Sequence, residues 1–133
     1  MLYLLDTNIC AYFMSRKYPL VTAKFRQHEP ADLLISSIVA GELAYGVENS
    51  TRIESNRKSL GLFLSKLRVL PYDESAMWHF GSQKAKLKKA GAKIGELDLL
   101  IACHALALGA VLVTNNTCEF ERIEGLRLEN WVA

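Results

Sequence analysis

The chain has 133 residues, half of them apolar, and its 16 basic and 14 acidic residues leave a net charge of +2. This length suits one domain over residues 1–133, with a core large enough to fold without disulfides. No stretch approaches the roughly 18 apolar residues of a membrane span, and no secretory signal opens the chain, so we expect no membrane attachment. Three cysteines without CxxC spacing exclude a zinc site and favour reduced thiols in the cytoplasm.

The first half of the chain alternates between short apolar runs and helical patterns. Residues 2–5 are apolar throughout and predict a buried strand, which helices at 6–14 and 20–27 follow. A second buried strand is predicted at 33–35. Ser37 is expected to cap the next helix.

The second half continues the alternation. Thr51 and Glu54 have the spacing of a capping box, which predicts the start of another helix. A short strand is expected at 69–70. The remaining predicted elements are a long helix from Asp73 to Gly91, a helix at 97–108, a buried strand at 111–113 and a last short strand that covers 126–131.

Apolar strands that alternate with helices predict an α/β fold, namely a three-layer α/β/α sandwich with a central parallel sheet. Ligands bind such sheets beyond the carboxyl ends of the strands. Asp6 and Asn116 come directly after predicted strands. Glu42 and Asp98 lie in the opening turns of helices that can line the same edge.

Each of the three carboxylates Asp6, Glu42 and Asp98 has a structural explanation when taken singly. Asp6 can cap a helix, Asp98 can interact with a helix dipole, and Glu42 can be an exposed helix residue. Gathered at one sheet edge, they would repel one another and take up protons unless a cation neutralised them. Mg²⁺ binds such oxygen ligands and can activate a water molecule to attack a phosphodiester. The set therefore predicts a metal-dependent hydrolase.

Four segments carry a resemblance to a known family: LLDTN at residues 4–8, SSIVAGELAYG at 36–46, IGELDLLIACHA at 94–105 and VTNNTCEF at 113–120. In this order and spacing they resemble the PIN domain, and specifically the VapC ribonuclease toxins of type II toxin–antitoxin systems. The resemblance implies a homodimeric endoribonuclease that uses Mg²⁺ or Mn²⁺ and is inhibited by a cognate VapB-type antitoxin, with which it can form a hetero-oligomer. Similarity to enteric VapC proteins suggests that the structured RNA substrate is initiator tRNA, whereas other relatives cleave ribosomal RNA.

The resemblance also assigns roles to individual positions. The three carboxylates match the family's acidic metal-site residues, with Asp6 and Asp98 expected to bind the metal directly. Asn116 departs from the family pattern, because many PIN domains have an aspartate there. Glu119 can supply the missing charge, although Asn116 and Glu119 also have the spacing of a capping box. Thr114 is expected to orient a carboxylate or a water molecule, like its family counterpart.

Positive charge is concentrated between Glu74 and Glu96, where the sequence has no acidic residue and contains Lys84, Lys86, Lys88, Lys89 and Lys93. The tract ends just before the loop that leads to Asp98, so it is expected to hold the RNA backbone near the site. A solvated helix face is the alternative explanation.

Four apolar residues of the middle helices exceed what a small core obviously needs: Tyr45, Leu60, Phe63 and Leu64. We expect part of this set to form a groove for an antitoxin helix and part to contribute to a dimer surface. The alternative is that all four pack in the core.

Two other functions belong to different classes. A receiver-like signalling module has a similar architecture, but it needs an acidic pair after the first strand and a lysine after a late strand. Asp6 is unpaired, and no lysine follows Val113. A non-catalytic binding module with an acidic pocket at the sheet edge is the second alternative.

Overall fold

A computed structural model describes residues 1–132, and within them five strands form one parallel sheet in the order β3-β2-β1-β4-β5. The strands are β1 (Tyr3–Leu5), β2 (Leu33–Ser36), β3 (Arg68–Leu70), β4 (Val111–Val113) and β5 (Leu128–Glu129). In the central register Leu4 lies beside Leu34 of β2 and Leu112 of β4. The predicted parallel sheet is therefore confirmed.

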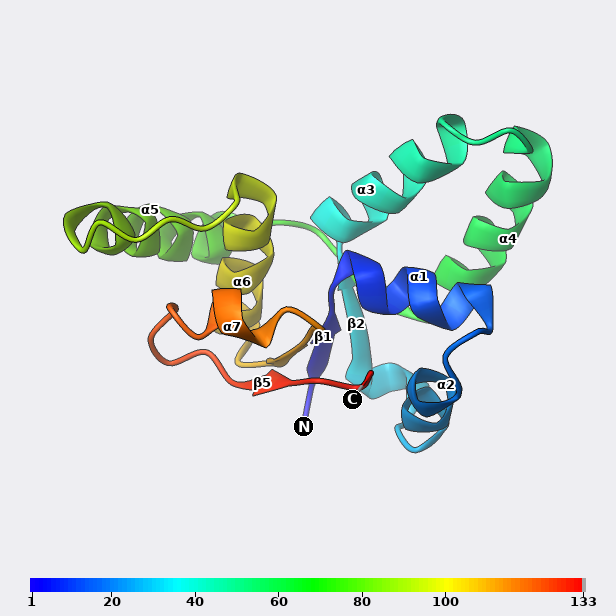
Figure 1. Ribbon diagram of the computed structural model, residues 1–133, viewed down its shortest axis with the longest axis horizontal. Helices are drawn as coiled ribbons and strands as arrows, with labels where there is room; N and C mark the ends of the chain where they lie inside the picture. Colours follow the sequence, from blue (N-terminus) through cyan, green and yellow to red (C-terminus); the bar gives the residue numbers. More distant parts are fainter. Residues whose placement is uncertain (133) are drawn as a thin grey trace.

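Helices connect the strands and cover both faces of the sheet. Their bounds are α1 (Thr7–Ser15), α2 (Pro19–Arg26), η1 (Pro30–Asp32), α3 (Ser37–Glu48), α4 (Ile53–Ser65), α5 (Glu74–Lys89), α6 (Glu96–Leu108) and α7 (Thr117–Phe120). Right-handed crossovers place α1 to α4 on one face and α5 to α7 on the other, because the chain moves outward to β3 and then returns to β4 and β5. Figure 1 shows α5, α6 and α7 on one side and α1, α2 and α4 on the other, so the three-layer α/β/α sandwich is confirmed.

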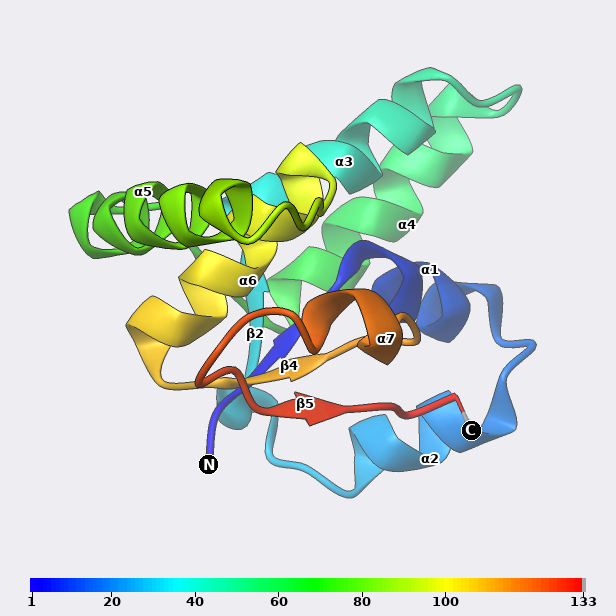
Figure 2. The same cartoon turned by 60° about the vertical axis from the view of Figure 1, so that its left-hand side comes forward.

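The connection after β4 is the shortest of these crossovers. Figure 2 shows α7 lying beside β4 and β5, so the single turn of helix covers the edge of the sheet that β5 closes. Within residues 1–132, no helix combines the length and the apolar character that a membrane crossing requires.

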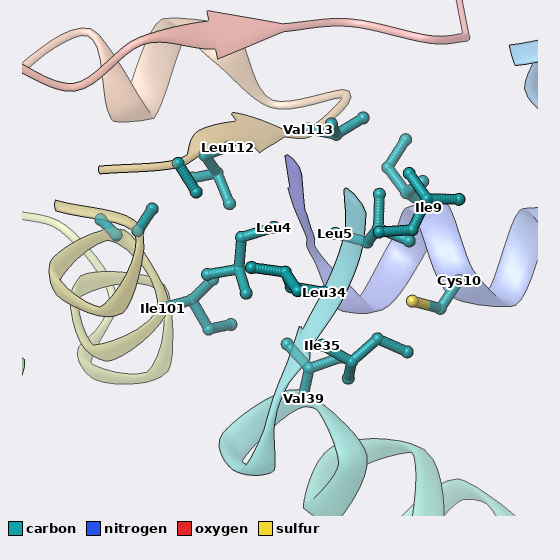
Figure 3. Packing of buried hydrophobic residues seen from close by; sticks show 14 of the residues in the cluster. Leu4, Leu5, Ile9, Cys10, Leu34, Ile35, Val39, Ile101, Leu112 and Val113 are labelled. Atoms are coloured by element: carbon teal, nitrogen blue, oxygen red, sulfur yellow. The ribbon is translucent and has the colours of Figure 1, made fainter. Parts of the chain in front are cut away.

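The core forms where the strands meet both helical layers. Leu4 and Leu5 are fully buried, and alternate residues of a strand face opposite sides of the sheet. Figure 3 shows Leu4 pointing toward Ile101 of α6 and Leu5 pointing toward Ile9 of α1. Strands covered on both faces are apolar throughout for this reason, and full burial of one leucine side chain stabilises the fold by about 2 kcal/mol.

Several predicted helix ends are confirmed. The carboxylate of Asp73 accepts a hydrogen bond of 3.0 Å from the backbone nitrogen of Ala76 and caps α5. Gly91 and Gly109 follow α5 and α6 with φ angles of 68° and 64°. Glycine adopts this left-handed conformation without the steric cost that a Cβ atom imposes.

Other predicted boundaries are wrong. Ser36, and not Ser37, caps α3, and the Ser37 hydroxyl instead accepts a hydrogen bond from the backbone nitrogen of Tyr72, which lies between β3 and α5. The capping box at Thr51 does not form, since α4 begins at Ile53 with no side-chain bond at its N-cap. The last strand covers Leu128–Glu129, which is shorter than predicted.

Replacement of Asp73 by alanine should lower the free energy of unfolding by about 1 kcal/mol, because it removes the N-cap of α5. Thr51→Ala is the matched control, since Thr51 makes no cap bond and its loss should change stability by less than about 0.5 kcal/mol. Urea denaturation followed by circular dichroism measures both changes. Equal losses in the two variants would contradict the assignment of the caps.

Candidate functional site

Asp6 stands at the carboxyl end of β1 and caps α1. Its carboxylate accepts a hydrogen bond of 2.9 Å from the backbone nitrogen of Ile9 and another from the hydroxyl of Thr114, which follows β4. Burial raises the pKa of Asp6, the hydrogen bonds lower it, and the charge of Glu42 raises it further. Thr114 therefore makes the contact that its expected orienting role requires. Asp6 combines a helix-capping role with a position among other carboxylates.

Glu42 lies on α3 and is half-buried. The hydroxyl of Thr7, the first residue of α1, donates a hydrogen bond of 2.6 Å to its carboxylate. This contact joins α3 to α1 beside Asp6. No local pattern predicts it, because the two residues lie 35 positions apart.

Asp98 lies in the first turn of α6, where its carboxyl group is half-buried. Burial is the main reason why its pKa is raised to about 6, and the charges of Glu119, Asp6 and Glu42 raise it further. A hydrogen bond with Glu119 adds to this shift. A hydrogen bond between two carboxyl groups requires a proton on one of them. The fold therefore gathers the three predicted carboxylates, and Glu119 with them.

Glu119 connects α7 to the loop before α6. One of its oxygens accepts a hydrogen bond of 3.0 Å from the backbone nitrogen of Gly95, and the side-chain amide of Asn116 donates to the other. Asn116 is the N-cap residue of α7 but makes no side-chain cap bond, so the capping-box alternative is wrong. Asn116 instead contacts the site through Glu119, and its own backbone nitrogen donates to the Thr114 hydroxyl.

Gly95 is a site residue that the sequence did not identify. A Cβ atom at this position would lie 3.5 Å from Oδ2 of Asp98 and 3.9 Å from Oε1 of Glu119. These are ordinary van der Waals distances, so Gly95 belongs to the site through the hydrogen bond that its backbone nitrogen donates to Glu119. Its place at the N-cap of α6, three residues before Asp98, is the only signal that the sequence offers.

The carboxylate oxygens of the site are suitable ligands for a hard divalent cation. Oxygen ligands of negative charge are those that Mg²⁺ prefers. Burial is the main cause of the raised pKa of Asp98, and the repulsion from neighbouring carboxylates that adds to it is what a cation would relieve. As the side chains stand in residues 1–132, no group of three or more His, Cys, Asp or Glu residues is arranged to hold a metal ion. The carboxylates are instead held by protein hydrogen bonds.

The five predicted RNA-binding lysines are exposed, and they lie on α5 and in the loop before α6. Lys84 forms an ion pair of 2.8 Å with Glu96, at the start of α6. Figure 1 shows that α5 extends away from the sheet and that residues 90–95 run back to α6. Lys86, Lys88 and Lys89 therefore lie toward the far end of α5, although Asp98 follows them closely in sequence. Lys93 lies in the returning loop, where its carbonyl accepts a hydrogen bond from Arg122.

The four residues predicted to bind the antitoxin lie in different environments. Leu60 and Phe63 are buried in the core and Leu64 packs against it, whereas Tyr45 is 70% exposed. Phe63 also lines a pocket of about 430 Å³ between α2, α4 and β2. The rest of its lining is Phe13, Phe25, Arg26, His28, Glu29, Pro30, Leu33, Lys66 and Leu67.

Comparison with known proteins places the chain among similar nucleases. The PIN domain model matches residues 3–126. The chain is 45% identical over 130 residues to Ribonuclease VapC2 of Haemophilus influenzae, with 98% of each chain covered. It is 41% identical over 129 residues to the tRNA(fMet)-specific endonuclease VapC of Shigella flexneri, with 97% of each covered. The structure of DNA-bound VapBC from Salmonella typhimurium matches with a TM-score of 0.93 and 42% identity, over 98% of this chain and 99% of that chain.

Asp98→Asn should stabilise the metal-free protein in EDTA by about 1 kcal/mol near pH 7.5, after solvent screening of a half-exposed group is allowed for. The pKa of Asp98 rises from 3.8 in the unfolded chain to about 6 in the fold. The folded state therefore holds this proton more tightly, and ionisation lowers stability as the pH rises through this range. Urea denaturation should show the advantage of the variant shrinking as the pH falls from about 7 to about 4.

Glu124→Gln, at an exposed loop position, is the matched control and should show no such pH dependence. Destabilisation by Asp98→Asn at every pH would contradict the proposed repulsion.

Proposed function

Because the chain belongs to the PIN-domain family, and within it to the VapC ribonucleases, we propose that it acts in the cytoplasm as a divalent-metal-dependent endoribonuclease toxin. One observation carries the chemical part of the proposal. Burial and three neighbouring carboxylates raise the pKa of Asp98 to about 6 at the carboxyl edge of the sheet. Such a concentration of negative charge, without a His or Ser nucleophile in it, suits metal-assisted hydrolysis.

Asp6 and Asp98 would hold the cation directly, and Glu42 would bind through water or position the attacking water molecule. A bound Mg²⁺ or Mn²⁺ ion would lower the pKa of water and offset charge on the phosphate. Thr114 holds Asp6, and Thr7 holds Glu42. These contacts reduce the reorganisation that ligand binding requires. Water as the nucleophile, in place of the ribose 2′-hydroxyl, leaves a 5′-phosphate.

Glu119 takes the fourth acidic position in this proposal, and Asn116 acts through it. The amide of Asn116 and the backbone of Gly95 each donate a hydrogen bond to the Glu119 carboxylate. Both donors fix the position of the Glu119 side chain beside Asp98. The site thus retains a fourth acidic residue, although position 116 is an amide.

The substrate that we propose is structured RNA, with initiator tRNA as the first candidate. Its support is the name of the Shigella flexneri relative, a tRNA(fMet)-specific endonuclease. The exposed lysines along α5 offer contacts to phosphates on one side of the site. Because Lys84 is paired with Glu96, we assign the RNA backbone mainly to the lysines farther along α5 and to Lys93.

The proposed partners are a VapB-type antitoxin and a second copy of the chain. The Salmonella typhimurium structure is a DNA-bound VapBC complex, which supports the first partner. Three phenylalanines line the pocket between α2 and α4, together with the cations Arg26 and Lys66. An apolar antitoxin side chain beside an acidic residue would match this lining. Tyr45, exposed on α3, is available to the antitoxin or to the dimer interface.

The nuclease mechanism predicts that Asp6→Ala lowers the rate of RNA cleavage by about a hundredfold or more, because it removes a cation ligand. Purified protein with Mg²⁺ is incubated with initiator tRNA transcript, and an elongator tRNA serves as the comparison substrate. Sequencing of the 5′ ends should locate the cut and detect a 5′-phosphate. Glu124→Gln is the matched carboxylate control and should cleave as the wild type does.

Absence of Mg²⁺-dependent cleavage by the wild type, on these transcripts and on total cellular RNA, would contradict the proposal. Equal cleavage by Asp6→Ala would contradict the role of that carboxylate. If the protein cleaves other RNA but not initiator tRNA, the proposed nuclease activity stands and the proposed substrate is wrong.

The antitoxin surface predicts that reversal of charge at both Arg26 and Lys66 weakens the complex with the cognate antitoxin by about tenfold. Lys58→Glu, an exposed position on the same α4 helix, is the matched control and should bind normally. Co-expression followed by titration calorimetry of the separated components measures both affinities. Unchanged affinity of the double variant would place the antitoxin elsewhere.

A further inference from the structure

A buried hydrogen bond joins the two helical layers at the carboxyl edge of the sheet. Nδ1 of His104, on α6, lies 2.8 Å from the hydroxyl oxygen of Ser36, at the end of β2. The two residues are 68 positions apart, and their exposed fractions are 1% and 0%. The bond therefore connects α6 on one face to the start of α3 on the other.

The protonation of this pair follows from the other contact of Ser36. Its hydroxyl oxygen already accepts a hydrogen bond of 3.1 Å from the backbone nitrogen of Ile38 and so caps α3. Burial lowers the pKa of His104, which favours the neutral imidazole. In the neutral ring, an unprotonated Nδ1 can accept a hydrogen bond from the Ser36 hydroxyl. This arrangement satisfies both buried groups and leaves the ring proton on Nε2.

The segment between β3 and α5 packs beside the same pair. The ring of Tyr72 meets the His104 ring edge to face, with a centroid distance of 5.2 Å. The backbone nitrogen of Tyr72 donates a hydrogen bond of 3.1 Å to the hydroxyl of Ser37. Asp73, the cap of α5, interacts electrostatically with His104. The starts of α3 and α5 are thus fixed around one imidazole of α6.

Each of the two joined helices carries a carboxylate of the candidate site. Glu42 lies six residues after Ser36, and Asp98 lies six residues before His104. Neither His104 nor Ser36 touches these carboxylates in any contact of the described residues. Because both helices are rigid, a contact that fixes α3 relative to α6 also fixes the separation of their carboxylates.

We propose that His104 and Ser36 are positioning residues, whose buried hydrogen bond holds Glu42 and Asp98 at the separation that cation binding requires. The inference rests on the proposed metal-dependent function. Loss of the bond changes the relative placement of α3 and α6. It therefore lowers the affinity for the cation without removing a ligand.

Mn²⁺ binding to the purified full-length protein, measured by electron paramagnetic resonance of free Mn²⁺ without RNA, tests the proposal. His104→Leu keeps an apolar side chain but removes the acceptor, and Ser36→Ala removes the hydroxyl. Both should raise the Mn²⁺ concentration at half-saturation by roughly threefold to tenfold, no more than the lower end of the about 10- to 100-fold loss seen when a group bonded directly to a ligand is removed. His104→Asn places an amide oxygen near the position of Nδ1 and should restore most of the affinity.

Val111→Ala is the control for lost stability, because Val111 is buried at the amino end of β4, away from the carboxylates. It should lower the melting temperature and leave the half-saturation concentration unchanged. A shift equal to that of His104→Leu would show that stability alone governs binding and would overturn the proposal. If His104→Leu does not fold, the Mn²⁺ half-saturation concentrations of Ser36→Ala and His104→Asn are compared instead.

The wild-type measurement separates the two levels of inference. A wild type that binds no Mn²⁺ overturns the proposed function and the positioning role together. A wild type that binds Mn²⁺, with folded His104→Leu or Ser36→Ala binding equally well, overturns the positioning role alone. Failure of His104→Asn to recover affinity also overturns it.

Discussion

Repulsion among carboxylates at the carboxyl edge of the sheet is the constraint on which this site depends. Burial and three like charges raise the pKa of Asp98 to about 6, so its ionisation costs more free energy in the fold than in the unfolded chain. A fold that gathers such groups must hold them by other contacts. Asp6 receives a backbone and a hydroxyl donor, and Glu42 and Glu119 receive donors of their own. A cation would neutralise the charge that these donors only partly offset.

The donors come from different parts of the sandwich. Thr114 follows β4, Thr7 opens α1, and Gly95 precedes α6. The site geometry is therefore a consequence of how the crossover helices pack on the sheet. The bond between His104 and Ser36 belongs to this framework, because it fixes helices of opposite faces at the same edge. Displacement of either layer would change the carboxylate positions without altering any of those residues.

Prediction from local sequence succeeded for the strands that are buried on both faces, because a short run of apolar residues in that position can only be a strand. Apolar runs too short for a helix form β1, β2 and β4, since only strands between two helical layers bury every side chain. Helix starts were predicted less well, because polar side chains near a start compete for several donors. Thr51 makes no cap, and Ser36 caps α3 while Ser37 accepts a hydrogen bond from Tyr72, which follows β3. Spacing alone does not distinguish these arrangements.

The sequence by itself determined the parallel sheet, the family resemblance and the placement of Asp6 and Asp98 beside one sheet edge. These features follow from strand ends and local motifs. Tertiary structure decided which groups hold the carboxylates, how Phe63 is buried, and that α5, which carries most of the lysines, extends away from the sheet. The physical reason is that such contacts join residues 24 to 68 positions apart. Packing of the crossover helices brings them together, and no local pattern records it.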